Sequence, residues 1–117
     1  MSQAKTAEFL ADCLSHMPDQ PEQLQCVVDT AIAGLKRIAD GQDWPEGEAW
    51  ATAWAANRAA NRAVTWAAAW AAMAAANWAA ADWAAWAARA ADWAARAHPD
   101  PDAERERQKA VRKELGV

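Results

Sequence analysis

The chain has 117 residues, of which 12 are Lys or Arg and 16 are Asp or Glu, so its formal net charge is -4. It holds 36 Ala and nine Trp but only 4 Gly and 5 Pro, which disfavours turn-rich β folds and disulfide scaffolds. This composition predicts one all-α domain over 1–117, a compact bundle of about five to six helices with an Ala- and Trp-rich core.

Residues 1–45 predict a helical hairpin. The first helix is expected over 2–16, and Pro18 ends it. The second follows Asp19 and runs to about Asp40, with Asp19 and Glu22 spaced as a capping box at its start and Pro21 in its first turn. The apolar stripes that pair the two helices are Phe9, Leu10, Cys13, Leu14 and Met17 on the first, and Leu24, Val27, Val28, Ala31, Ile32, Leu35 and Ile38 on the second.

The excess negative charge lies in the same hairpin, which carries seven acidic and three basic side chains. Because the apolar faces pack together, four aspartates are expected to point outward and to steer a basic protein partner. They are Asp12, Asp29, Asp40 and Asp43. The rest of the chain is balanced in charge and offers no basic face, which disfavours binding to duplex nucleic acid.

The Ala- and Trp-rich segment 46–98 predicts three helices. No Gly or Pro occurs from 48 to 98, yet one helix of that length would reach about 75 Å. Such a helix would also carry Trp on all sides, so we expect breaks near 61–65 and near 77. The helices are predicted near 46–62, 65–77 and 79–97, with most of the Trp side chains in the core.

Residues 99–117 predict a charged C-terminal helix. Asp100 precedes Pro101 as an N-cap, and the helix is expected to continue through Leu115. Two intrahelical ion pairs are expected, Glu104 with Arg107 and Glu106 with Lys109. The helix should dock along a narrow apolar stripe made of Ala103, Ala110, Val111 and Leu115.

The sequence predicts a cytoplasmic protein with no membrane segment. Its first residues lack the apolar stretch of a secretory signal. Residues 66–88 have the length of a membrane span, but Asn77 and Asp82 would then lie in the middle of the bilayer.

The candidate binding site consists of Trp and Arg residues spaced by four. Such spacing places the side chains on one helix face, where guanidinium groups can stack on indoles. Exposed Trp and Arg side chains are typical of protein-interface hot spots, and Trp with Arg can also hold a nucleotide-like ligand. The predicted binding residues are Trp54, Arg58, Arg62, Trp66, Arg89, Trp93 and Arg96, and Asp92 is four residues from Arg96.

The sequence predicts no catalytic residues, no cofactor and no metal site. Cys13, His16 and Cys26 could supply three zinc ligands, but no fourth is evident. Both thiols are therefore expected to be buried small apolar groups. Nucleophilic triads, phosphate loops and calcium loops have no matching pattern.

Three segments carry a resemblance to a known family. They are Ala-Trp-Ala-Ala-Asn-Arg-Ala-Ala (53–60), Ala-Asp-Trp-Ala-Ala-Arg-Ala (91–97) and Glu-Arg-Glu-Arg-Gln (104–108). In this order, over roughly 24–115, they resemble the alanine-rich immunity proteins of bacterial polymorphic toxin systems. The resemblance implies a helical inhibitor of a toxin, and small helical proteins of this kind also occur among phage counter-defence factors.

Together these features predict a non-enzymatic helical protein that inhibits or neutralises a protein partner, of the immunity or phage counter-defence type. Two alternatives stay open. One is a protein that binds or sequesters a nucleotide-like ligand by Trp and Arg stacking, and the other is a structural bundle that forms homo-oligomers.

Overall fold

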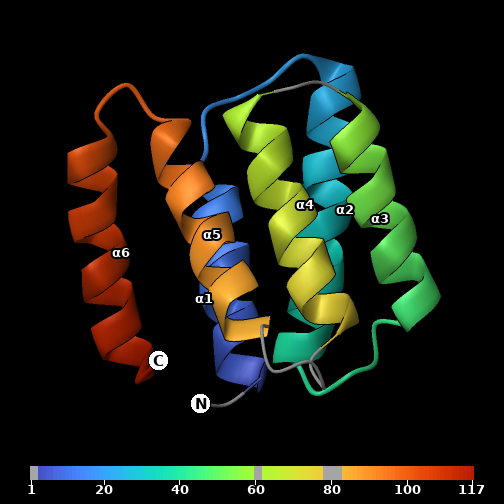
Figure 1. Ribbon diagram of the computed structural model, residues 1–117. Helices are drawn as coiled ribbons and strands as arrows, with labels where there is room; N and C mark the ends of the chain where they lie inside the picture. Colours follow the sequence, from blue (N-terminus) through green and yellow to red (C-terminus); the bar gives the residue numbers. More distant parts are fainter. Residues whose placement is uncertain (1–2, 60–61, 78–82) are drawn as a thin grey trace.

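The computed structural model describes residues 3–59, 62–77 and 83–117, and its backbone there is helical with short connections. In chain order the helices are α1 (Gln3–Ser15), α2 (Glu22–Ala39), α3 (Glu46–Ala59), α4 (Ala63–Ala76), α5 (Trp83–Arg96) and α6 (Pro101–Leu115). Helices α3, α4 and α5 form a front layer over α1 and α2, and α6 packs at the edge against α5 and α1 (Figure 1). The predicted all-α bundle is confirmed.

The three-helix division of segment 46–98 is also confirmed. Helix α4 begins at Ala63, where the backbone N–H of Arg62 donates to Thr65 Oγ1 (3.3 Å) and that hydroxyl donates to the Arg62 carbonyl (2.9 Å). Helix α4 ends at Ala76, before Asn77, as the polar residue there predicts. The predicted start of the next helix, at 79, lies outside the described residues.

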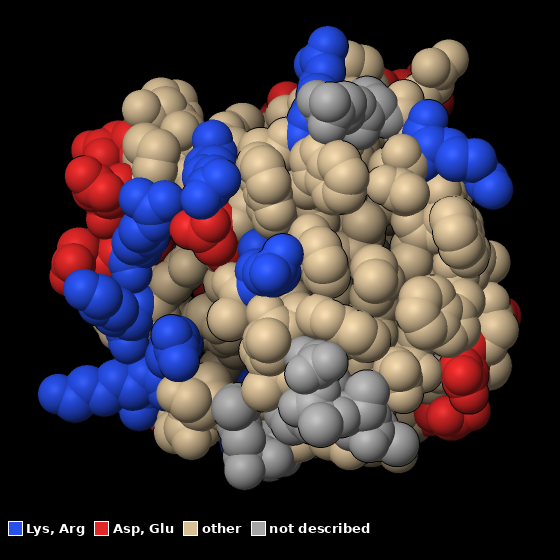
Figure 2. Space-filling model, viewed as in Figure 1, with Lys and Arg blue, Asp and Glu red and all other residues tan. Residues whose placement is uncertain are grey.

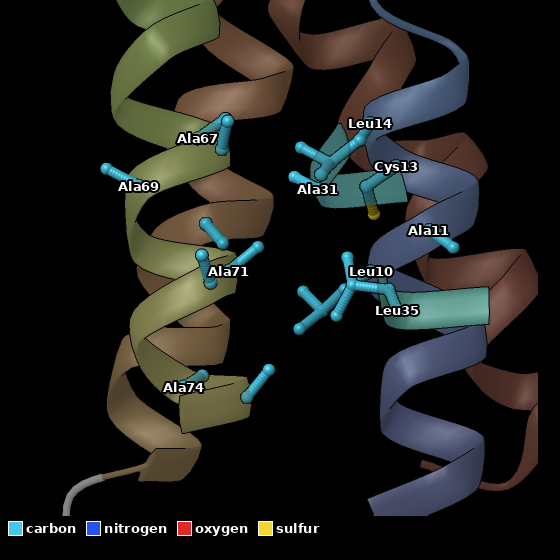
Figure 3. Close-up of a cluster of buried hydrophobic side chains, with 14 of the residues drawn as sticks. Leu10, Ala11, Cys13, Leu14, Ala31, Leu35, Ala67, Ala69, Ala71 and Ala74 are labelled. Atoms are coloured by element: carbon cyan, nitrogen blue, oxygen red, sulfur yellow. The ribbon is translucent and has the colours of Figure 1, made fainter. Parts of the chain in front are cut away.

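Alanine forms most of the core between the layers. Leu10, Leu14 and Leu35 project from α1 and α2 toward α4, whose buried alanines include Ala67 and Ala71 (Figure 3). Helices that meet through Ala approach to about 8 Å, which leaves no room for an indole between their axes. Tryptophan is consequently displaced to the rim of the helix contacts.

The expectation that most Trp side chains lie in the core is therefore wrong. Among the described side chains, Trp44 is buried and Trp54 is 57% exposed. Five others are half-buried: Trp50, Trp66, Trp70, Trp86 and Trp93.

Helix α6 docks through polar side chains as well as through half of the predicted apolar stripe, because Val111 and Leu115 are partly buried against the core. Glu104 and Gln108 are buried, whereas Ala103 and Ala110 are exposed. The Gln108 amide donates to the carbonyl of Ala91 on α5 (3.0 Å). Hydrogen bonding by buried polar side chains thus adds to the apolar contacts of α6, which a count of apolar residues does not reveal.

Segment 66–88 is divided between α4 and α5, each of 14 residues. A membrane-spanning helix needs about 20 apolar residues. Within the described part of the chain, no helix has both the length and the apolar character needed to cross a bilayer.

Candidate functional site

Helices α3 and α4 run antiparallel to each other (Figure 1). A pocket lined by tryptophan lies between them and has a volume of about 300 Å³. Each helix contributes residues at positions i, i+3, i+4 and i+7, which share one helix face. The lining residues are Trp50, Ala53, Trp54 and Asn57 on α3, and Trp66, Ala69, Trp70 and Met73 on α4. The small, buried Ala53 and Ala69 leave the space that the indoles enclose.

Helix α5 extends this aromatic surface. Trp66 stacks on Trp93 with ring centroids 6.1 Å apart. The guanidinium carbon of Arg89 lies 5.1 Å from the centroid of the Trp70 ring, and that of Arg96 lies 4.8 Å from the Trp93 ring. We call the set Trp50, Trp54, Trp66, Trp70, Trp93, Arg89 and Arg96 the tryptophan surface.

The structure brings five of the seven predicted binding residues to the tryptophan surface, namely Trp54, Trp66, Arg89, Trp93 and Arg96. Arg58 and Arg62 are exposed, and neither lines the pocket. The spacing of four between Trp and Arg does not identify four other residues of the pocket, which are Trp50, Asn57, Trp70 and Met73. A different pattern in the sequence does include them, because the pocket residues recur at i, i+3, i+4 and i+7 on two consecutive helices.

The stacking partners differ from those that a spacing of four predicts. Arg89 lies over Trp70 of the neighbouring helix instead of over Trp93, and Arg96 covers Trp93 from three residues away. Contacts between helices therefore decide where the Arg89 side chain rests.

The outward position predicted for the four aspartates holds for three of them. Asp29, Asp40 and Asp43 are exposed. Asp12 is not free to steer a partner, because its Oδ2 accepts a hydrogen bond from Arg107 Nη1 at 2.7 Å. The prediction was wrong for Asp12 because α6 packs against α1 and brings a cation to that carboxylate.

Arg107 connects α1 to the buried carboxylate of α6. Its Nε donates to both carboxylate oxygens of Glu104 (3.0 and 2.9 Å), as the predicted pairing of these residues requires. Hydrogen bonding to Glu104 raises the pKa of the guanidinium above its ordinary value. Glu104, Arg107 and Asp12 thus hold the edge helix in place.

The two cysteines lie in different environments. Cys13 is buried as expected, whereas Cys26 is exposed, so the prediction for Cys26 was wrong. Cys26 lies two residues from both Leu24 and Val28, which places it on the opposite side of α2 from the buried face. Within the described residues, no three His, Cys, Asp or Glu side chains are grouped to hold a metal ion.

Burial, and next the charge of Asp12, raises the pKa of the Cys13 thiol well above its ordinary value of 9.0. We expect iodoacetamide at pH 8 to alkylate Cys26 rapidly and Cys13 only on unfolding, as peptide mass spectrometry would show. Above pH 9 the Cys13 thiol stays neutral in the native protein but ionises in the unfolded chain. The free energy of unfolding is therefore unaffected below pH 9 and falls above it, by at most about 1.4 kcal/mol per pH unit. In urea titrations, the free energy of unfolding of Cys13→Ala should fall less steeply above pH 9 than that of the parent protein. Equal alkylation of both thiols in the native protein would contradict this account.

Comparison with known proteins gives no matching family model, no matching curated protein and no matching solved structure.

Proposed function

We propose that this is a non-enzymatic helical binding protein that inhibits or neutralises a protein partner, of the immunity or phage counter-defence type, and that it binds through the tryptophan surface. The observation that carries the proposal is Trp54, which is 57% exposed at the mouth of a pocket lined by three further indoles. An exposed indole beside a preformed pocket has apolar area left to bury, and Trp and Arg dominate the energetics of protein interfaces.

The composition of the pocket favours an apolar side chain of a protein over a nucleotide-like ligand. None of the eight lining residues is charged. Phosphate groups are held by Arg or Lys side chains and by clustered backbone N–H groups, and Arg58 and Arg62 lie outside the lining. The volume also lies at the lower end of the usual range for ligand sites, about 300–1,000 Å³.

Trp54→Ala is the variant that tests the proposed function. Its side chain is exposed, so helicity and melting temperature should match those of the parent protein. Loss of an interface hot spot costs at least about 2 kcal/mol, so affinity for the partner should fall by about 30-fold or more.

The partner is found by capturing proteins from a bacterial lysate on the parent protein, with Trp54→Ala and the exposed α6 variant Lys113→Ala as parallel baits. The expected partner is retained by Lys113→Ala and lost by Trp54→Ala. Its purified activity should be inhibited by the parent protein and by Lys113→Ala but not by Trp54→Ala. A partner that Trp54→Ala inhibits equally well would contradict the proposal. Sedimentation of the free protein as a dimer that Trp54→Ala dissociates would favour the oligomeric bundle instead.

A further inference from the structure

A positive charge without a carboxylate partner in the described part of the chain lies beside the α3–α4 pocket. Among the described residues, Arg58, Arg62 and Arg89 form no ion pair, and all three are exposed. Arg89 lies over Trp70, one wall of the pocket. A guanidinium group has five N–H donors, and Arg89 donates to no acceptor in the described part of the chain. Its charge and donors therefore remain available to a ligand.

The other basic groove of the protein provides a contrast. A pocket of about 280 Å³ between α1, α5 and α6 is lined by Arg105, Lys109 and Arg112. Arg105 is already paired with Asp92 (3.2 Å) and Asp102 (3.1 Å), and Lys109 is paired with Glu106 (3.0 Å). Arg112 stacks over Phe9. Two of the three cations of that groove, Arg105 and Lys109, are thus paired with carboxylates of the protein itself, whereas Arg89 forms no ion pair within the described part of the chain.

The face over α3, α4 and α5 is largely uncharged, with Lys or Arg side chains at its centre and upper border (Figure 2). Acidic and basic side chains are interspersed over α6, and acidic side chains also gather at the border where α3 begins (Figure 2). Since opposite charges across an interface set its specificity, this face fits a ligand that combines an apolar group with a few negative charges.

We propose that the tryptophan surface recognises an acidic segment of the partner protein, with an apolar or aromatic side chain in the α3–α4 pocket and an adjacent carboxylate bound by Arg89. This inference rests on the proposed function and specifies the chemistry of the partner. The acidic segment proposed here is opposite in charge to the basic partner that the aspartates of residues 1–45 suggest. None of those aspartates lines the pocket, so they do not determine what binds there.

A polyanion fits this face less well than a short acidic segment. Single-stranded nucleic acid also combines stacking bases with charge, but it needs a continuous cationic groove. Here the net charge of the whole chain is -4, and the pocket walls themselves are uncharged. A segment with only a few carboxylates avoids the repulsion that a long polyanion would meet.

The test uses a capped pentapeptide with a central Phe flanked by two Asp on each side. Three comparison probes are the same peptide with Asn in place of Asp, the same peptide with Ala in place of Phe, and a single-stranded oligothymidylate. Binding is followed from the indole N–H resonances of the full chain. We expect the Asp-Phe peptide to bind, and to bind about tenfold or more tightly than the Asn or Ala peptide.

Arg89→Gln should weaken binding of the Asp-Phe peptide by about tenfold, whereas Lys113→Gln, which removes one positive charge on exposed α6, should change it less than about twofold. Equal binding of the Asp and Asn peptides, an unchanged Arg89→Gln variant, tighter binding of oligothymidylate or no peptide binding would each overturn the inference. Lysate capture with Trp54→Ala tests the proposed function separately, so a protein interface without acidic preference would fail the peptide test and still pass the capture test.

Discussion

Trp44→Ala is expected to lower the free energy of unfolding by about 3–5 kcal/mol. Trp44 lies in the connection between α2 and α3 and is 7% exposed, so nearly its whole indole is removed from water. The ring rests on α2 at Gly34, so Ala at position 44 would leave a cavity over the helix backbone. Urea denaturation followed by far-UV circular dichroism measures the loss.

The contact with Gly34 supplies an internal control for this prediction. A Cβ atom at Gly34 would overlap the Trp44 ring, so Gly34→Ala should destabilise the parent protein by about 1–3 kcal/mol. In the Trp44→Ala background the indole ring is absent, so a Cβ atom at position 34 meets no such overlap. Gly34→Ala should then stabilise the variant by up to about 1 kcal/mol, because Ala has a higher helix propensity than Gly.

Gly47 is the matched control position, because it lies on the exposed first turn of α3 and no atom lies within 4 Å of an added Cβ. Gly47→Ala should therefore be neutral or stabilising by up to about 1 kcal/mol in either background. If Gly34→Ala destabilised the parent protein and the Trp44→Ala variant equally, the ring contact would not be the cause.

Local signals in the sequence located the helices well, because they act between neighbouring residues. The predicted N-cap of α6 is confirmed, since Asp100 Oδ1 accepts from the backbone N–H of Ala103 (3.2 Å) and Pro101 begins the helix. The capping box predicted for α2 is wrong. Pro21 occupies its N-cap position without a side-chain hydrogen bond, so Asp19 lies too early to cap.

Burial was harder to predict, because it depends on the distance between helix axes. A helix wheel shows which residues share a face, but it does not tell whether Ala or Trp from that face reaches the centre. In this fold the alanines meet directly, and Trp50, Trp66 and Trp70 are pushed to the margin, where they line a pocket. The pocket exists because the core is made of alanine.

Side-chain pairs from different helices were beyond the reach of spacing rules. Arg89 with Trp70 and Trp66 with Trp93 join neighbouring helices, and Asp12 with Arg107 joins residues 95 positions apart. Each of these pairs changes how a candidate residue is interpreted. Asp12 becomes a residue that holds α6 against α1, and Arg89 becomes a cation beside Trp70, which lines the pocket.

Arg107→Met is expected to destabilise the protein by about 3 kcal/mol, at the lower end of the cost of breaking a buried ion pair, because the Arg107 side chain is 29% exposed. The substitution keeps the aliphatic length but leaves the buried carboxylate of Glu104 without its hydrogen-bond donors, and it releases Asp12 on α1. Since α6 contacts only α5 and α1 among the described helices, its end nearest Glu104 should open first, as hydrogen exchange of α6 amides would show.

Lys109→Met is the matched control, because Lys109 and Glu106 form a pair with the same three-residue spacing on the same helix, but both side chains are more than 70% exposed. Solvent screens that pair, so its loss should cost no more than about 0.5 kcal/mol. Adding Glu104→Gln to Arg107→Met removes the buried charge and should recover part of the lost stability. Equal losses in Arg107→Met and Lys109→Met, or no recovery in the double variant, would show that α6 is held by its remaining apolar contacts rather than by the Glu104–Arg107–Asp12 cluster.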